Sequence, residues 1–349
     1  MLYSKIEYIL LSKIISEKII LEKKHKLFCQ IFLNSIRSKN NLFKNIEVFK
    51  QNMDSDIVLL LEKYNSLKER KIAEEELKIS SSNNIKFLFY EEKRFPENFK
   101  KIDTPPIMLY YIGQFPKDSS LKYSISIIGS RNCYENFGGR LAYKVGQQVS
   151  KEKIWNISGL ALGIDTFGHL GSLSQNGYTG AFLAQGLLTS IYPKENIDLF
   201  YKIIKKKGFI ATEYSIYSKI YYKKFTLRNR LQAGLVDSLF IPEFNEKSGT
   251  LSTIEYGLKY NKNVYICNPK KTLEIDINLK EFNKGNALFS FNDSILKKLY
   301  PDFKIENFKK TRIYKIIHNK SYKYEIVEKI PDFKKNDNII MIDQQKKLF

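Results

Sequence analysis

The sequence predicts an α/β protein in which a parallel sheet is covered by helices and preceded by a separate helical region. Two observations support this prediction. Between residues 123 and 267, short apolar runs rich in β-branched residues alternate with helix-length segments, which is the order of βα units. Before residue 80, Leu and Ile instead recur every three to four residues and proline is absent, which is typical of helices.

Residues 1–79 are expected to form a small helical domain. The first apolar residues, from Ile9 to Ile20, are interrupted by charges of both signs, which fits an amphipathic helix and excludes a signal peptide. The polar run at 80–84, Ser-Ser-Ser-Asn-Asn, breaks this pattern and predicts a loop. Residues 80–120 are therefore expected to be a linker and a strand-containing arm that leads into the core.

Within this arm, apolar runs at 85–90 and 107–112 predict two short strands. The segment between them contains Pro96 and the sequence Asp103-Thr104-Pro105-Pro106. Residues that precede proline favour extended backbone, so this segment is expected to be rich in turns.

The core is expected over residues 121–290, with strands at 124–128, 154–157, 179–184, 209–212, 238–241 and 263–267. The carboxyl ends of parallel strands and the N-termini of the following helices gather at one edge of such a sheet, where ligands bind. The unusual residues of this sequence follow those strand ends. Residues 291–349 form a basic extension with expected helices at 312–319 and 324–330 and a strand at 338–342.

The charge balance favours a polyanionic partner. The 349 residues include 58 Lys and Arg against 37 Asp and Glu, a formal net charge of +21, so nucleic acid is the first expectation and a membrane surface the second. AT-rich codon usage is an alternative origin, because Asn, Ile, Tyr and Phe are also abundant. No apolar run reaches the length of a membrane span, so no membrane partner is expected.

The three cysteines and three histidines lie far apart in the sequence. They form no CxxC pair, and the odd cysteine count argues against a disulfide framework, so a reducing cytoplasmic location is expected, with no metal site. No Ser or Cys nucleophile can be paired with a histidine, and no catalytic residue is assigned.

The first core strand runs into Gly129-Ser130-Arg131. Glycine lets backbone N–H groups approach an oxyanion, and arginine can bind a phosphate through two N–H groups, so this segment is a candidate anion site. An ordinary tight turn and a dinucleotide site are alternatives, although the G-x-G-x-x-G pattern is absent.

The second core strand ends in Ser158-Gly159, followed by Asp165 and His169. We expect Asp165 to cap the next helix rather than to take part in catalysis. His169 lies four residues further on, on the same helix face, and is expected to be a structural hydrogen-bonding residue.

The most basic stretch lies at 223–230 and contains Lys224, Phe225, Arg228, Asn229 and Arg230. Cations beside an aromatic ring can bind phosphates and stack a base, which single-stranded nucleic acid requires. The alternative is a solvated helix start with Phe225 in the core. Further on, Ser248-Gly249-Thr250 opens another helix and is either a second anion site or a simple helix cap.

Together these motifs resemble the DprA/Smf family of bacterial DNA-processing proteins over about residues 85–290. The motifs are, in order, GSR at 129–131, SGLALGID at 158–165 followed by His169, YPKEN at 192–196, TE at 212–213, FTLRNR at 225–230 followed by AGL, and EKSGTLST at 246–253. The resemblance implies an extended Rossmann-like core, a SAM-like helical domain before it, and a short C-terminal tail or reduced winged helix after it.

The resemblance also implies a function. Members of the family bind single-stranded DNA, form a homodimer and load the RecA recombinase onto incoming strands during natural transformation, without an enzymatic step or a cofactor. The DNA-binding residues carried over by motif are Gly129, Ser130, Arg131, Ser158, Gly159, Lys224, Phe225, Arg228, Asn229, Arg230, Ser248, Gly249 and Thr250. Three departures from the family pattern put local loop shape in doubt: Thr226 replaces the usual proline, Gln185 interrupts the motif of the third strand, and Asn268-Pro269 replaces Pro-Gly.

Two other functions compete with this interpretation. Glu243, Ser248-Gly249-Thr250 and Glu255 faintly resemble the Gly-Thr-Glu motif of phosphoribohydrolases, so the pocket could instead bind a nucleotide or cleave a nucleoside phosphate. In the other alternative, the helical N-terminal domain does the binding. For the homodimer, the apolar segment 258–288 is the expected contact, because a sheet edge would otherwise expose it.

Overall fold

The computed structural model describes residues 1–50, 53–133, 138–244 and 248–268, together with four strands further along the chain. Its main feature is a nine-stranded sheet in the order β1-β2-β6-β5-β4-β3-β7-β8-β9. The strands are β1 Lys86–Phe89, β2 Met108–Gly113, β3 Ile125–Ile127, β4 Asn156–Ser158, β5 Thr179–Phe182, β6 Phe209–Thr212, β7 Ser238–Ile241, β8 Asn263–Asn268 and β9 Leu288–Ser290. From β6 to β9 all neighbouring strands pair in parallel, whereas β2 pairs antiparallel with both β1 and β6. The predicted α/β class is confirmed.

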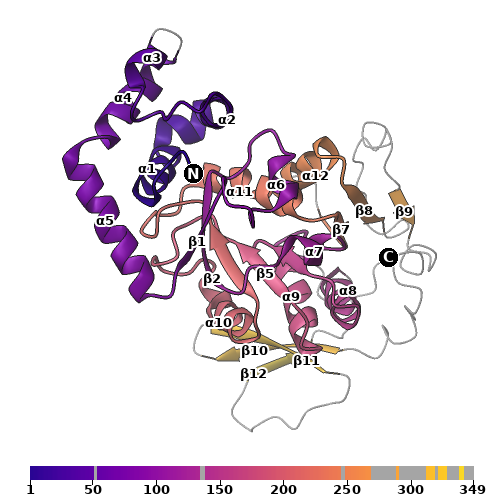
Figure 1. Ribbon diagram of the computed structural model, residues 1–349. Helices are drawn as coiled ribbons and strands as arrows, with labels where there is room; N and C mark the ends of the chain where they lie inside the picture. The colour runs from indigo at the N-terminus through magenta and orange to yellow at the C-terminus, as the bar shows by residue number, and fades with distance from the viewer. Residues whose placement is uncertain are drawn as a thin grey trace.

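Between β3 and β8, where the structure describes the helices, five of them form the crossovers that join successive parallel strands. They are α8 Arg140–Lys151, α9 Ile164–Ser174, α10 Ile197–Lys205, α11 Tyr222–Leu235 and α12 Thr250–Lys259. The chain moves from β3 to β6 in one direction along the sheet and from β7 to β8 in the other. Right-handed crossovers then place α8, α9 and α10 on one face and α11 and α12 on the other (Figure 1). The strand order reverses between β3 and β7, and at this point a crevice opens outside the carboxyl ends of the strands.

The N-terminal region is helical, as predicted. It consists of α1 Lys5–Ile15, a π-helical turn at Ile20–Lys24, α2 His25–Ser38, α3 Ile46–Lys50, α4 Ser55–Tyr64 and α5 Leu67–Ser82. Ser4 begins α1 with a capping box, in which its hydroxyl accepts from the amide of Glu7 and the Glu7 carboxylate accepts from the amide of Ser4. Figure 1 shows α1 and the end of α5 on the side of β1 and β2, with α3 and α4 further from the sheet, and Tyr8 of α1 and Glu76 of α5 contact Phe89 of β1 and Tyr110 of β2.

The loop predicted at 80–84 is only partly correct, because α5 continues through Ser82. The hydroxyls of Ser81 and Ser82 donate to the carbonyls of Leu77 and Lys78 one turn earlier, so these serines are compatible with the helix. The turn is made by Asn83 and Asn84 alone, and Asn84 has a φ of 55°.

The N-terminal helices and the sheet share one hydrophobic core. Tyr8 of α1 packs on Phe89 of β1 with ring centroids 4.7 Å apart, and the hydroxyls of Ser12 and Tyr110 are 2.8 Å apart. The same buried cluster extends from Phe28 and Phe32 of α2 to residues of β2, β5, β6 and α10.

The arm before the core forms the predicted pair of short strands, with Lys86 opposite Tyr111 and Phe89 opposite Met108. Two short helices, α6 Glu97–Lys100 and α7 Asp118–Leu121, complete it. Of the six predicted core strands, β6 and β7 have the expected bounds, whereas β4 begins two residues later than predicted because Ile154 still bonds to the end of α8.

The two helices predicted in the C-terminal extension are wrong. Residues Arg312–His318 and Ser321–Val327 are strands β10 and β11, which pair antiparallel with each other, and β12 Asn338–Met341 pairs with β10. Both segments are rich in Ile, Val and Tyr and are separated by the two residues Asn-Lys, a pattern that favours a hairpin over a helix. The predicted strand at 338–342 is confirmed. Within the described ranges, no helix is long and apolar enough to cross a bilayer.

Candidate functional site

A cleft of ≈ 340 Å³ lies at the carboxyl ends of the parallel strands, at the point where the strand order reverses. The loop after β3 forms one wall, α11 forms another, and the start of α12 closes the third side. The lining residues are Ile128, Gly129, Ser130, Arg131, Asn132, Ala161, Asp165, Phe225, Thr226, Arg228, Asn229, Gln232, Ser248, Gly249, Thr250 and Thr253. Nine of the thirteen residues assigned to the site from the sequence are among them, and Gly159 lines a small hollow beside the cleft.

The loop after β3 is shaped by a close backbone contact. A Cβ atom at Gly129 would lie 2.3 Å from the carbonyl oxygen of Glu243, so glycine is required there. The Ser130 amide donates to the same carbonyl at 2.9 Å, which fixes the turn that presents the next side chain, Arg131.

Arg131 is the exposed cation of the cleft. Its guanidinium carbon lies 5.4 Å from the centroid of the Phe225 ring, within the range of a cation–π contact. Within the described part of the chain, no carboxylate lies within ion-pair distance of Arg131. Its charge is therefore available to an anion that enters the cleft.

Asp165 organises the loop after β4 from the first turn of α9. Its carboxylate accepts from the amide of Gly159 at 2.8 Å and from that of Ala161 at 3.4 Å. The expected helix cap is wrong, because the residue at the N-cap of α9 is Gly163. Burial raises the pKa of Asp165 to about 6, and the positive charge of Arg228 and the bond from the Gly159 amide oppose this increase only in part.

Ser158 does not reach the cleft. Its hydroxyl is 2.8 Å from Nε2 of His169, whose Nδ1 is 2.6 Å from the hydroxyl of Thr179. All three side chains are buried, and burial lowers the pKa of His169 to about 3, so the imidazole is neutral. The structural hydrogen-bonding role predicted for His169 is confirmed.

Arg228 lies three residues after Phe225 on α11 and joins this helix to the sheet. It is 5% exposed, and its Nη1 donates to the carbonyl of Gly159 at 2.8 Å and to that of Phe182. A Cβ at Gly159 would lie 2.6 Å from this guanidinium, so only glycine permits the contact. Burial lowers the pKa of Arg228 to about 10, so the group remains charged at neutral pH.

The start of α12 completes the cleft. The Ser248 hydroxyl accepts from the amide of Thr250 at 3.2 Å and is 2.7 Å from its hydroxyl. Asn229 ties this segment to α11, because its Nδ2 donates to Ser252 Oγ at 2.8 Å and to the Gly249 carbonyl at 3.2 Å. Space is open beside Gly249, so its backbone can be approached closely.

Lys224 and Arg230 were predicted to face the cleft, and the structure contradicts this. Lys224 is 4% exposed, and its ammonium donates to the carbonyl of Lys219 at 2.9 Å and to the hydroxyl of Ser218, while burial lowers its pKa to about 8. Arg230 is fully buried and forms two 2.6 Å bonds to the carboxylate of Glu213. Both cations are satisfied inside the protein, so they have a structural role.

Tyr192 belongs to the site but was not identified from the sequence. Its ring meets that of Phe225 edge-on, with centroids 5.7 Å apart. Tyr192 also lines the small hollow behind Phe225, of ≈ 30 Å³, together with Arg131, Gly159 and Arg228. The YPKEN motif marked this loop in the sequence, but nothing in the motif showed that the loop reaches α11.

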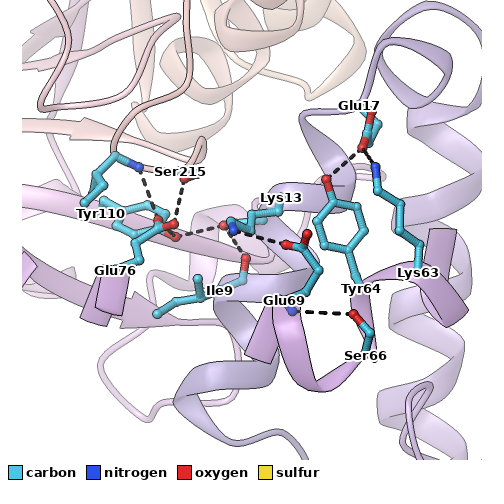
Figure 2. Close-up of polar contacts among 12 residues, drawn as sticks. Ile9, Lys13, Glu17, Lys63, Tyr64, Ser66, Glu69, Glu76, Tyr110 and Ser215 are labelled. Carbon is cyan, nitrogen blue, oxygen red and sulfur yellow. Dashed lines mark hydrogen bonds and ion pairs between the residues drawn. The ribbon is translucent and has the colours of Figure 1, made fainter. Parts of the chain in front are cut away.

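The N-terminal helices hold the segment that leads into α11 (Figure 2). The buried carboxylate of Glu76 accepts from the hydroxyls of Tyr110 and Ser215, each at 2.8 Å, and from the amide of Ile216 at 3.2 Å. At the other end of the segment, the hydroxyl of Tyr221 donates to Glu22. Among the described residues, no cluster of His, Cys, Asp and Glu could hold a metal ion.

The protein-family model described as DNA recombination-mediator protein A matches residues 86–299 of the chain. Protein Smf of Borreliella burgdorferi is 29% identical over 236 residues, which cover 66% of this chain and 74% of that protein. DNA processing protein DprA of Streptococcus pneumoniae is 31% identical over 176 residues, which cover 49% of this chain and 58% of that protein. The chain thus spans little more than half of the length of this second relative.

Solved structures resemble the fold, among them those of two DNA-processing proteins. The X-ray structure of DprA from Streptococcus pneumoniae has a TM-score of 0.67 at 21% identity and covers 87% of this chain and 99% of that chain. A structure of DNA processing protein A from Helicobacter pylori, described as showing a single-stranded DNA binding mode, has a TM-score of 0.52 at 26% identity and covers 63% and 98% of the two chains.

Proposed function

Because the chain belongs to the DNA recombination-mediator protein A family, we propose that it binds single-stranded DNA in the cleft between β3, α11 and α12. The Helicobacter pylori relative is described by its single-stranded DNA binding mode, and its structure covers 63% of this chain at 26% identity. Binding of this kind breaks no bond, so the proposal includes no catalytic residue and no cofactor.

The observation that carries the proposal is the pairing of Arg131 with Phe225 at the cleft. The exposed guanidinium, 5.4 Å from the ring centroid, supplies a charge for a phosphate, and the half-buried ring beside it supplies a surface on which a base can stack. Phosphate binding and base stacking are the two interactions that single strands require. Arg228, on the same helix as Phe225, and the backbone of Ser248 to Thr250, at the start of α12, also line the cleft and add polar contacts for the same strand.

The cleft favours single strands over duplex. In a duplex the bases are stacked on each other and cannot reach Phe225, and the site presents no helix or ribbon shaped to enter a groove. We expect fluorescence anisotropy at matched salt to give a lower Kd for an oligothymidylate than for duplex DNA of equal length. Equal affinity for both would contradict the proposal.

A mononucleotide arm of the same titration tests the alternative use of the cleft. If the cleft binds a strand, AMP and dTMP compete only weakly with the oligonucleotide, because each offers one phosphate and one base. Competition at a mononucleotide concentration close to the Kd of the oligonucleotide would favour the nucleotide-binding alternative.

The proposal extends to a homodimer that loads RecA. Its support is family membership together with the apolar segment 258–288, of which the described part includes the buried Val264 of β8; residues 269–287 lie outside the described residues. We expect a dimer in sedimentation velocity at micromolar concentration. We also expect the protein to increase the ATPase activity of RecA on single strands coated with a single-strand-binding protein. A monomer, or no stimulation, would contradict the corresponding part.

A further inference from the structure

We propose that the bound strand continues out of the cleft over a second aromatic surface formed by Tyr192 and Tyr222, called here the outer tyrosine surface. This inference rests on the proposed function and adds to it a second contact region for single-stranded DNA. The starting point is size, because a cleft of ≈ 340 Å³ holds about one nucleotide, so the rest of any longer strand must lie on the surface outside.

Tyr192 and Tyr222 belong to a group of exposed aromatic and apolar side chains near the cleft. Tyr192 is 45% and Tyr222 62% exposed, and Tyr217 and Ile220 nearby in the sequence are 55% and 43% exposed. Exposed apolar side chains scattered singly need no explanation, but a group of them beside a candidate site indicates a binding surface.

Phe225 connects this surface to the cleft. The ring of Tyr192 contacts Phe225 edge-on at 5.7 Å and 68°. Tyr222 lies three residues before Phe225 on α11, so the two side chains are neighbours on one helix face. Phe225 thus lines the cleft and also adjoins both tyrosines, so the outer tyrosine surface begins at this edge of the cleft.

Backbone hydrogen bonds hold the two tyrosine-bearing segments together. The amide of Gly186 donates to the carbonyl of Ser218 at 2.8 Å, and the amide of Leu188 donates to that of Ile216 at 2.9 Å. The loop that ends in Tyr192 thus runs beside the segment that leads to Tyr222. Both tyrosines belong to one continuous surface rather than to two independent loops.

The charge around the outer tyrosine surface fits a nucleic-acid strand. Lys223 lies with its ammonium 5.4 Å from the Tyr222 ring centroid, and Lys194 and Lys219 are exposed on the two loops. The exposed carboxylate on these segments is that of Glu195, whereas Glu22 accepts from Tyr221. Aromatic rings interleaved with lysines bind single strands with little sequence preference.

The chain offers a matched control in Tyr123. It is 66% exposed, and Lys122 lies 5.3 Å from its ring centroid, which closely reproduces the local environment of Tyr222. Tyr123 precedes β3, so it lies at the amino end of the strand, at the opposite edge of the sheet from the cleft. Loss of Tyr123 removes an exposed tyrosine beside a lysine without touching the proposed path.

The experiment titrates the 349-residue chain with labelled oligothymidylates of about 2 nucleotides, which the cleft alone can hold, and of about 20 nucleotides, which also reach the outer tyrosine surface. The variants are the double change Tyr192→Ala with Tyr222→Ala, the control Tyr123→Ala, and Phe225→Ala as a probe of the cleft itself. We expect the double variant to lose about tenfold or more in affinity for the long oligonucleotide and less than about twofold for the short one. The double change Tyr192→Phe with Tyr222→Phe should keep the wild-type affinity, because stacking needs the ring and not the hydroxyl.

The outcomes separate this inference from the proposed function. Equal losses of the double variant for both lengths, or no loss for either, would overturn the outer tyrosine surface, as would an equal loss in Tyr123→Ala. If instead Phe225→Ala binds both lengths like the wild type, the proposed cleft itself is wrong. Circular dichroism melts of all variants show whether any loss comes from unfolding. If the double alanine variant unfolds, the single changes Tyr192→Ala and Tyr222→Ala, each at an exposed position, make the same comparison.

Discussion

The two arginines of the cleft differ in what surrounds them, and this difference assigns their roles. Arg228 is 5% exposed, and its Nη1 donates hydrogen bonds to the carbonyls of Gly159 and Phe182. Loss of this side chain would therefore disturb both the fold and the binding of a ligand. Arg131 is exposed and contacts the ring of Phe225. Arg131 is therefore the residue whose substitution reports on binding alone.

We expect Arg131→Ala to weaken binding of single-stranded DNA by about 1 to 3 kcal/mol, because one phosphate contact is lost. The slope of log Kd against log salt should fall by about one counterion. Lys151, exposed at the end of α8, is the matched control, and Lys151→Ala should leave both quantities nearly unchanged. If both variants lose the same affinity, binding comes from diffuse charge and the site is wrongly placed.

We expect Asp165 to make the binding of single-stranded DNA depend on pH. Burial raises its pKa to about 6, so its charge opposes DNA phosphates above pH 6 and disappears below it. We expect Kd to decrease as the pH falls from about 7.5 to about 5.5, since a phosphate nearby raises this pKa further. Asp165→Asn should bind at pH 7.5 as the wild type does at pH 5.5 and lose the pH dependence.

The alternative titrating groups near this range are histidines, and burial lowers the pKa of His25 and, to about 3, that of His169. A pH dependence that persists in Asp165→Asn would assign the effect to another group. The same shift affects stability. Because the folded pKa lies above the unfolded value of about 3.9, the stability gained from protonating Asp165 is fully present below about pH 4 and is lost as the pH rises through 6.

At the scale of single elements, the sequence shows where the cleft is but not which way each side chain points. Glycine, serine and arginine after β3 and the basic start of α11 were placed correctly because strand ends and helix starts have local signals. Lys224 and Arg230 were misplaced, because their partners Ser218 and Glu213 are brought to them by the loop after β6. Which face of α11 is buried depends on packing that no local pattern records.

The prediction of two helices in the C-terminal extension is wrong for a related reason. Ile313, Ile316 and Ile317 recur at spacings that fit a helix as well as a strand, and the pairing of β10 with both β11 and β12 decides between them.

Two of the departures from the family pattern, Thr226 and Gln185, leave the cleft intact. Thr226 is exposed at the rim of the cleft, and the side chain of Gln185 donates to the hydroxyl of Thr189 and to the carbonyl of Ser190.

Glu76 joins α5 to β2 and to the segment before α11, and its contribution to stability can be tested directly. Glu76→Ala leaves three buried donors, on Tyr110, Ser215 and Ile216, without their acceptor. Each costs about 1 to 3 kcal/mol, so we expect the free energy of unfolding to fall by about 3 kcal/mol or more. The adjacent Glu75 is exposed, and Glu75→Ala should change the free energy of unfolding by less than about 0.5 kcal/mol. Urea denaturation of the two variants makes the comparison, and equal stabilities would show that Glu76 does not anchor the segment before α11.

At the scale of the whole molecule, the helical region and the sheet are joined more closely than a domain boundary near residue 79 suggests. The family model matches from residue 86, and the sequence changes character at the serine run. Yet α1, α2 and α5 contribute to the same buried cluster as β1, β2 and β6, and Glu22 and Glu76 hold both ends of the segment that leads into α11. The N-terminal helices therefore act as part of the support of the cleft.

Deletion of residues 1–82 tests this arrangement. The deletion exposes the face of β1 and β2 on which aromatic residues such as Tyr8 and Phe32 pack, and each buried side chain of this size contributes about 1.5 to 3 kcal/mol. Whole domains are stable by only about 5 to 15 kcal/mol, so we expect the shortened chain to lose its cooperative thermal transition and to bind a hydrophobic dye. Adding the purified fragment 1–82 should restore part of the transition, because the lost contacts are non-covalent. A shortened chain that melts cooperatively and binds single-stranded DNA with the affinity of the full chain would show instead that residues 1–79 are an independent domain.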